Sequence, residues 1–121
     1  MAPPVSQVPA QPFTHLTADF IGVAAAKLQD QSLVSGLVIA AAGAVGLNPA
    51  GAPVVRPLPD GVVAGLLMLD GCHIVAHAFP GRALLLLDIL ATSRQDTQKA
   101  VEVFTRRLAP TEVRSEIRAR G

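Results

Sequence analysis

The sequence predicts an α+β two-layer sandwich, in which two helices pack on one face of a single, mainly antiparallel sheet. The first observation is the order of patterned segments along the chain: a strand, a helix, several strands, a helix and a final strand. The second is a pair of tight-turn signals, Asp70-Gly71 and Pro80-Gly81, which separate three consecutive strand-like runs and predict hairpins. The chain has 121 residues, which matches one domain of about 100–200 residues.

The first strand is predicted from period-two alternation between Thr14 and Phe20, and Gly22 ends it. One side carries His15, Thr17 and Asp19, whereas the other carries Leu16, Ala18 and Phe20. His15 and Asp19 therefore share a strand face, where they either line a cleft or point to water.

The first helix is predicted to begin at Asp30 or Ser32, since both residue types cap helices. Apolar residues then recur at helical spacing, namely Leu33, Val34, Leu37, Val38, Ala41, Ala42 and Val45. Gly46 and Pro49 are typical of a helix end and stop the pattern.

Four strands are predicted for the middle of the chain. Val54 and Val55 indicate a short strand, and a turn follows that contains Pro57, Pro59, Asp60 and Gly61. The next three strand-like runs span residues 62–69, 72–79 and 83–90. The last run is apolar at nearly every position, which predicts a central strand that is covered at least partly on both faces.

The C-terminal region predicts a helix and an edge strand. The helix is expected to start near Ser93 or Asp96 and to end at Pro110, and it turns four residues inward: Ala100, Val101, Phe104 and Leu108. Residues 112–120 alternate between apolar and charged side chains, which is typical of an edge strand with one wet face. One sheet face then stays free, and it either meets solvent or pairs with a second copy, so a homodimer is expected.

The N-terminal segment and the compartment are predicted from composition. Residues 1–12 contain four prolines without apolar periodicity, so a disordered Pro-rich arm is expected before a single domain at 13–121. The N-terminus lacks a basic region followed by an apolar one, and the apolar run 37–47 is shorter than the roughly 18–20 residues of a membrane span. A cytoplasmic protein without membrane contact is therefore expected.

Charge and cysteine content argue against several classes of protein. The formal net charge is +1, and residues 93–121 hold seven Lys or Arg against four Asp or Glu. The chain has no Trp or Tyr to stack on bases, so this basic tail indicates a solvated face rather than a nucleic-acid partner. A single cysteine, Cys72, excludes an internal disulfide framework and a zinc-finger pattern.

Several motifs follow one another in a specific order: His15-Leu16-Thr17-Ala18-Asp19-Phe20-Ile21-Gly22, then Arg56-Pro57-Leu58-Pro59-Asp60-Gly61, then Cys72-His73-Ile74-Val75-Ala76-His77-Ala78-Phe79-Pro80. Asp88, Asp96 and Lys99-Ala100 complete the series. In order and spacing this series resembles the bacterial and archaeal S-adenosylmethionine decarboxylases over about residues 14–121. The likeness implies the same α+β sandwich.

The resemblance also implies a particular chemistry. In that family a serine hydroxyl attacks its own preceding carbonyl, a histidine helps to eliminate the resulting ester, and a pyruvoyl group remains on the new N-terminus. The pyruvoyl group forms a Schiff base with the substrate amine and acts as the electron sink. His77 matches the processing histidine, but Cys72 stands where the serine is expected and Ala64 where a second processing serine is expected.

Three further departures fall on positions that contact the substrate in the family. Thr92 stands where a cysteine supplies the proton, Gly81 where a glutamate lies beside the cleft, and Pro57 where an aromatic ring stacks on adenine. The resemblance therefore implies a diverged member that lacks the pyruvoyl-forming serine.

The candidate site combines residues from this resemblance and from strand position. Cys72 and His77 are predicted as catalytic, and six residues are predicted to bind the substrate: His15, Asp19, His73, Phe79, Asp88 and Thr92. Asp88 is interpreted either as a paired structural carboxylate or as a cleft acid. His73 and His77 lie four residues apart on a strand, about 13 Å, which is too far for one metal ion. No metal or cofactor is expected, unless Cys72 processes itself to a pyruvoyl group.

Three functions stay open from the sequence. The first is an uncleaved enzyme without a pyruvoyl group that acts on a different small molecule, for which the Ala-, Val- and Pro-rich composition suggests specialised metabolism. The second is a pyruvoyl-dependent decarboxylase of S-adenosylmethionine or another amino acid, self-processed at Gly71-Cys72. The third is a catalytically silent regulatory partner of an active paralogue. The first is the preferred interpretation.

Overall fold

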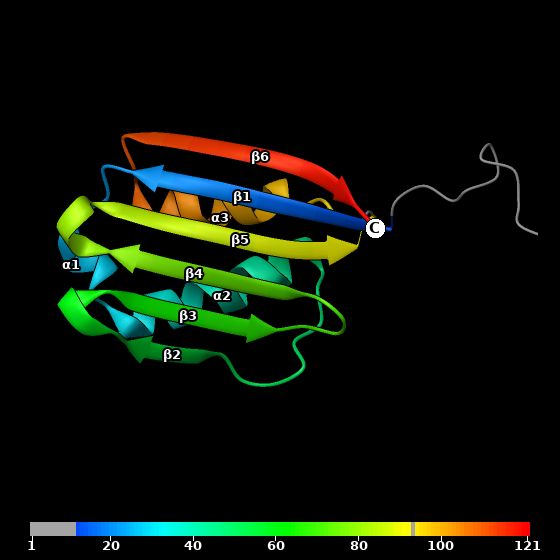
Figure 1. Cartoon of the computed structure of the whole chain (residues 1–121), viewed down its shortest axis with the longest axis horizontal. Helices are drawn as coiled ribbons and strands as arrows, with labels where there is room; N and C mark the ends of the chain where they lie inside the picture. Colours follow the sequence, from blue (N-terminus) through cyan, green and yellow to red (C-terminus); the bar gives the residue numbers. More distant parts are fainter. Residues whose placement is uncertain (1–11, 93) are drawn as a thin grey trace, which may run out of the picture.

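The computed structural model describes residues 12–92 and 94–121, and these form one sheet with helices on one side (Figure 1). Its six strands are all paired antiparallel in the order β2-β3-β4-β5-β1-β6. The elements are β1 (Phe13–Ile21), α1 (Ala25–Leu28), α2 (Gln31–Val45), β2 (Val54–Pro57), β3 (Val63–Met68), β4 (His73–Phe79), β5 (Leu84–Thr92), α3 (Gln98–Leu108) and β6 (Glu112–Arg120). The predicted fold class is confirmed. The predicted Pro-rich arm lies almost entirely outside the described residues.

Helix α2 has the ends that its sequence predicts. The carboxylate of Asp30 accepts a hydrogen bond of 3.0 Å from the backbone N–H of Leu33, which satisfies one of the free donors at the helix start. Gly46 ends the helix in the left-handed region at a φ of 85°. The four-residue helix α1 was not predicted, and α3 begins at Gln98, later than expected.

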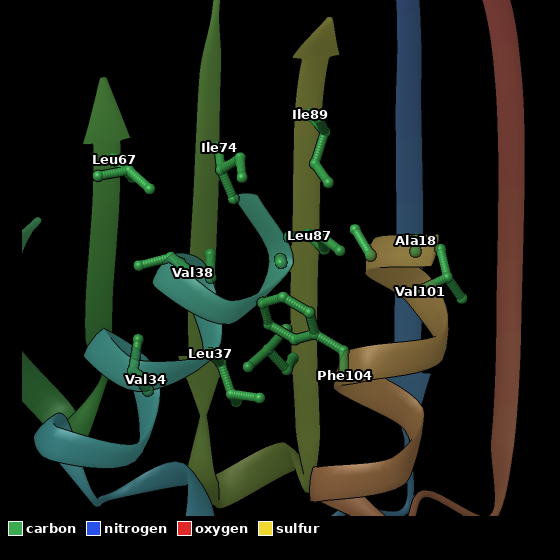
Figure 2. Close-up of a cluster of buried hydrophobic side chains, with 14 of the residues drawn as sticks. Ala18, Val34, Leu37, Val38, Leu67, Ile74, Leu87, Ile89, Val101 and Phe104 are labelled. Atoms are coloured by element: carbon green, nitrogen blue, oxygen red, sulfur yellow. The ribbon is translucent and has the colours of Figure 1, made fainter. Parts of the chain in front are cut away.

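The core lies between the sheet and the two long helices, α2 and α3. Figure 2 shows Phe104 pointing from α3 into this layer, beside Leu37 of α2 and Leu87 of β5. The Phe104 ring stacks on Phe20 of β1 with centroids 5.6 Å apart. All four residues predicted to face inward from α3 are buried: Ala100, Val101, Phe104 and Leu108. The apolar side chains of both helices therefore cover one face of the sheet.

Helix α2 approaches the sheet closely at Gly65 of β3. A Cβ atom at this glycine would lie 2.8 Å from Cγ1 of the buried Val34, which is inside van der Waals contact. The missing side chain of Gly65 therefore lets α2 rest directly on β3.

The opposite side of the sheet, here called the open face, has no helix over it in the described chain (Figure 1). Alternate residues of each strand point to it, including Asp88 and Leu86 of β5, and Leu86 is 37% exposed. The predicted central position of this strand is confirmed, because β5 lies between β4 and β1, but no second layer covers its open face in the described chain. The apolar run does not require a second covering layer, because a leucine on a strand can stay partly exposed to solvent.

The two edges of the sheet are β2 and β6, and the predicted C-terminal edge strand is confirmed. Strand β6 pairs with β1 without a break over nine residues, from Glu112 opposite Ile21 to Arg120 opposite Phe13. None of the helices in the described residues is long and apolar enough to cross a membrane.

Candidate active site

A cluster of two histidines and one aspartate occupies the open face where β1, β5 and β4 run side by side. Asp88 uses both carboxylate oxygens: Oδ2 accepts from His15 Nε2 at 2.9 Å, and Oδ1 accepts from His73 Nε2 at 3.0 Å. In register, both histidines lie opposite Leu90, two residues after Asp88 on the same face. The aspartate therefore meets one imidazole from each neighbouring strand.

The charge of Asp88 is controlled by this arrangement. Partial burial raises the pKa of the Asp88 carboxyl, but the hydrogen bonds and the positive potential of His15 and His73 outweigh it and hold that pKa below its usual value. The carboxylate therefore stays ionised at neutral pH and orients both rings. Because each ring donates from Nε2, a neutral ring keeps Nδ1 as a proton acceptor.

A hollow of about 420 Å³ lies beside this cluster. It is lined by polar and apolar side chains of three strands, among them Thr17, Asp19, His73, Val75, His77 and Asp88. A second hollow, of about 550 Å³, is lined by Asp60, Phe79 and Arg82. Leu86 lies between the two hollows and lines both of them. The first hollow is lined by two histidines and two aspartates, so it is the better candidate for the reaction centre.

His77 lies on the open face of β4, two residues beyond Val75, the residue that pairs with Asp88. Its ring stacks on Phe79 with centroids 6.3 Å apart, and its backbone pairs with Ala64 of β3. Ala64 is the position at which the family resemblance implies a second serine. The side chain directly opposite His77 on β3 is therefore a methyl group and provides no hydroxyl.

Cys72 belongs to the other side of the sheet. It lies just before β4, is 8% exposed and is part of the apolar core beneath the helices. Burial raises the pKa of the Cys72 thiol, which lowers the fraction of reactive thiolate. Because successive strand residues alternate between faces, the buried Cys72 and the open-face His77 are not brought together. Their predicted catalytic role stays a prediction.

The other predicted binding residues lie on the open face at different distances from the cluster. Asp19 lines the first hollow and Phe79 the second. Thr92 stands at the end of β5, four residues and therefore about 13 Å beyond Asp88. Among the described residues, no group of three or more His, Cys, Asp or Glu is arranged to hold a metal ion.

All three residues of the His15–Asp88–His73 cluster are predicted site residues, but their contact could not be predicted from the sequence. The alternation of apolar and polar residues places each of them on the polar side of its strand, and this is the sequence signal that all three share a face. Their meeting depends on β5 lying between β1 and β4, and His15 and Asp88 are 73 positions apart in the chain.

Comparison with known proteins agrees with the fold described above. Residues 14–121 match the S-adenosylmethionine decarboxylase family. The chain belongs to this family. The crystal structure of the adenosylmethionine decarboxylase from Aquifex aeolicus VF5 superimposes with a TM-score of 0.82 at 21% identity, covering 93% of each chain. No curated protein sequence matches the chain. This family is one of lyases. At 21% identity, the likeness to the Aquifex structure shows the fold alone.

Proposed function

We propose that this member of the S-adenosylmethionine decarboxylase family is an enzyme that acts on a small molecule by acid–base catalysis on the open face, without a pyruvoyl group. The observation that carries the proposal is the carboxylate of Asp88, which binds two solvent-accessible imidazoles at 2.9 and 3.0 Å. A carboxylate that orients a histidine is a recurring arrangement in general-base catalysis, because it holds the ring and stabilises the imidazolium.

The residues that would form a pyruvoyl group fit that role poorly. The group would have to arise by attack of Cys72 Sγ on the carbonyl of Gly71, and the thiol is buried in the core with a raised pKa. Ala64, opposite His77, provides no hydroxyl to assist the elimination. These two features support an enzyme that no longer processes its own chain.

The residues around the first hollow support proton transfer to or from a bound ligand. An imidazole of the cluster accepts a proton at Nδ1, and the ionised Asp88 stabilises the positive ring that results. Thr17 and Asp19 supply further hydrogen-bonding groups to the same hollow. Arg82 in the neighbouring hollow would attract an anionic group. A small anionic molecule that lies over Leu86 would therefore contact both hollows.

Intact-mass spectrometry of the purified protein tests the absence of self-processing. We expect a single 12.5 kDa chain after prolonged incubation. Two fragments that separate at Gly71-Cys72, with the mass of a pyruvoyl group rather than a cysteine at the start of the C-terminal fragment, would instead establish the pyruvoyl-dependent alternative. The variant Cys72→Ser is the informative comparison, because it restores the residue type that the family uses for cleavage.

Ligand titration followed by NMR tests the site itself. S-adenosylmethionine and a panel of small carboxylates serve as probes, and the chain has only three histidines to assign: His15, His73 and His77. We expect ligand-dependent shifts of these rings and about tenfold weaker binding by Asp88→Asn, the loss typical of one charge-assisted contact. Asp70→Asn, in the hairpin before β4, is the matched control and should bind like the wild type. Equal affinity of Asp88→Asn and the wild type would contradict the proposal.

A further inference from the structure

The second hollow, which Phe79 and Arg82 line, differs from the first in the chemistry of its walls. Its apolar lining includes Val62, Phe79, Leu84 and Leu86. The first hollow is lined instead by two histidines and two aspartates. The open face therefore carries an apolar compartment next to an ionisable one.

The strand register explains why apolar side chains gather at this end of the sheet. Phe79 is the last residue of β4 and pairs with Leu84, the first residue of β5, while His77 pairs with Leu86. Open-face positions follow every second residue, so these four side chains are neighbours on one face. Leu86 is 37% exposed, and Phe79 and Leu84 are half-buried. A ligand with an apolar body would remove this surface from water, which favours its binding.

The turn between β4 and β5 adds a positive charge to the second hollow. Residues Pro80–Arg82 form this turn, and the exposed Arg82 side chain lines the hollow. Within residues 12–92 and 94–121, the guanidinium of Arg82 forms no ion pair. Its planar set of N–H donors matches the two oxygens of a carboxylate. The hollow is therefore complementary to a ligand that has an apolar body and one anionic end.

The two hollows are connected by side chains that they share or that touch. Leu86 lines both of them, and the His77 ring of the first stacks on the Phe79 ring of the second with centroids 6.3 Å apart. Leu84 and Asp88 are four residues apart on β5, which corresponds to about 13 Å. An elongated ligand bound at Arg82 would therefore reach the imidazoles of the first hollow.

We propose that Arg82 sets the specificity of this enzyme for an elongated apolar monocarboxylate. The carboxylate pairs with Arg82, the apolar body lies over Phe79 and Leu86, and the far end reaches the ionisable side chains of the first hollow. The inference rests on the proposed function, because it names the class of molecule on which the acid–base site acts. That function involves no pyruvoyl group, so the ligand needs no amine to form a Schiff base.

Asp60 places a negative charge on the other side of the same hollow. It lies in the turn before β3, whereas Arg82 lies in the turn before β5, and β4 runs between these two strands. The carboxylate of the ligand is therefore expected on the β5 side, away from Asp60. Asp60→Asn removes the repulsion and should tighten carboxylate binding about two- to fivefold. Weaker binding by this variant would indicate a ligand held through a positive group and would contradict the proposal.

Isothermal titration calorimetry on the full chain tests the charge at Arg82. Hydrocinnamate is the probe, with hydrocinnamyl alcohol as the analogue without charge and acetate as the analogue without an apolar body. We expect hydrocinnamate to bind about tenfold more tightly than either analogue, and Arg82→Gln to weaken it about five- to tenfold. Arg106→Gln, the same change at an exposed position of α3, is the matched control and should bind like the wild type. Equal affinity of acid and alcohol would overturn the proposal.

A pair of variants at Gly81 separates charge from shape. A Cβ atom added at Gly81 has no other atom within 4 Å, so the turn accommodates a side chain there. Gly81→Glu places a carboxylate next to Arg82 and should weaken hydrocinnamate binding about tenfold. Gly81→Gln has nearly the same size without the charge and should bind within about twofold of the wild type. Equal weakening by both variants would show that the side chain only blocks the hollow, which contradicts selection by charge.

The histidine signals in an NMR titration with hydrocinnamate distinguish this inference from the proposed function. Binding that depends on Arg82 but shifts neither His73 nor His77 would support selection by the second hollow and contradict the proposed function. Histidine shifts that are the same in the wild type and Arg82→Gln would overturn the role of Arg82 and leave the proposed function intact. We expect shifts of both rings in the wild type and smaller shifts at the same ligand concentration in Arg82→Gln.

Discussion

The two faces of the sheet are built from the same strands but differ in what their side chains do. Strand β4 buries Ile74, Ala76 and Ala78 beneath the helices, whereas His73 and His77 point to the open face. The covered face is apolar and closely packed, and the open face holds the ionisable groups. The comparison shows that Cys72, which is close to two histidines in the sequence, lies on the covered side of the sheet among buried apolar residues.

Truncation of one phenylalanine on each face should show most clearly that the covered face contributes more to stability than the open face. Phe104→Ala removes a ring that is fully buried and stacked on Phe20, so we expect a loss of about 3–5 kcal/mol in the free energy of unfolding. Phe79→Ala, on the open face, removes a half-buried ring and should cost about 1 kcal/mol. Urea denaturation measures both, and similar losses would mean that the open face is packed as tightly as the core.

Gly65→Ala, which adds a methyl group on the covered face, should lower the free energy of unfolding by less than Phe104→Ala does. The added Cβ would meet Val34 Cγ1 at 2.8 Å, so α2 or Val34 must move, and we expect a loss of about 1–3 kcal/mol. Gly43→Ala is the control, because this exposed position in α2 has no atom near the new Cβ. It should stabilise the protein by about 0.5–1 kcal/mol through helix propensity. A neutral Gly65→Ala in thermal denaturation would contradict close packing there.

Removal of the charge of Asp88 should have the smallest effect on stability and a characteristic pH dependence. The pKa of Asp88 is lower in the folded chain than in the unfolded one, so its carboxylate stabilises the fold above the unfolded value of about 4. That stabilisation is lost as the pH falls through the folded pKa. Because the side chain is partly exposed, Asp88→Asn should cost about 1 kcal/mol or less at pH 7.

Urea denaturation of the wild type and Asp88→Asn between pH 7 and pH 2 measures this linkage. The difference between the two proteins should shrink towards zero at the acidic end. Asp19→Asn is the control, since the Asp19 carboxylate makes no hydrogen bond within residues 12–92 and 94–121. A difference that stays constant with pH would show that the hydrogen bonds to His15 and His73 do not lower the pKa of Asp88.

Much of the fold could be predicted because its signals are local. The cap at Asp30, the glycine at Gly46 and the alternation along β6 act within a few residues, and the structure confirms each of them. Helix α1 was missed because tertiary contacts hold it. Lys27 Nζ donates hydrogen bonds to the backbone carbonyls of Arg107 and Leu108 at the end of α3, 80 or more positions away.

The sequence by itself determined the strand and helix pattern, the family motifs and the face on which each strand residue lies, because alternation and capping are properties of neighbouring residues. Only the tertiary structure decided that β5 lies between β1 and β4, so that Asp88 joins His15 and His73. It also placed Cys72 in the core, away from His77. Strand order depends on how the whole chain buries its apolar surface, and no short segment carries that information.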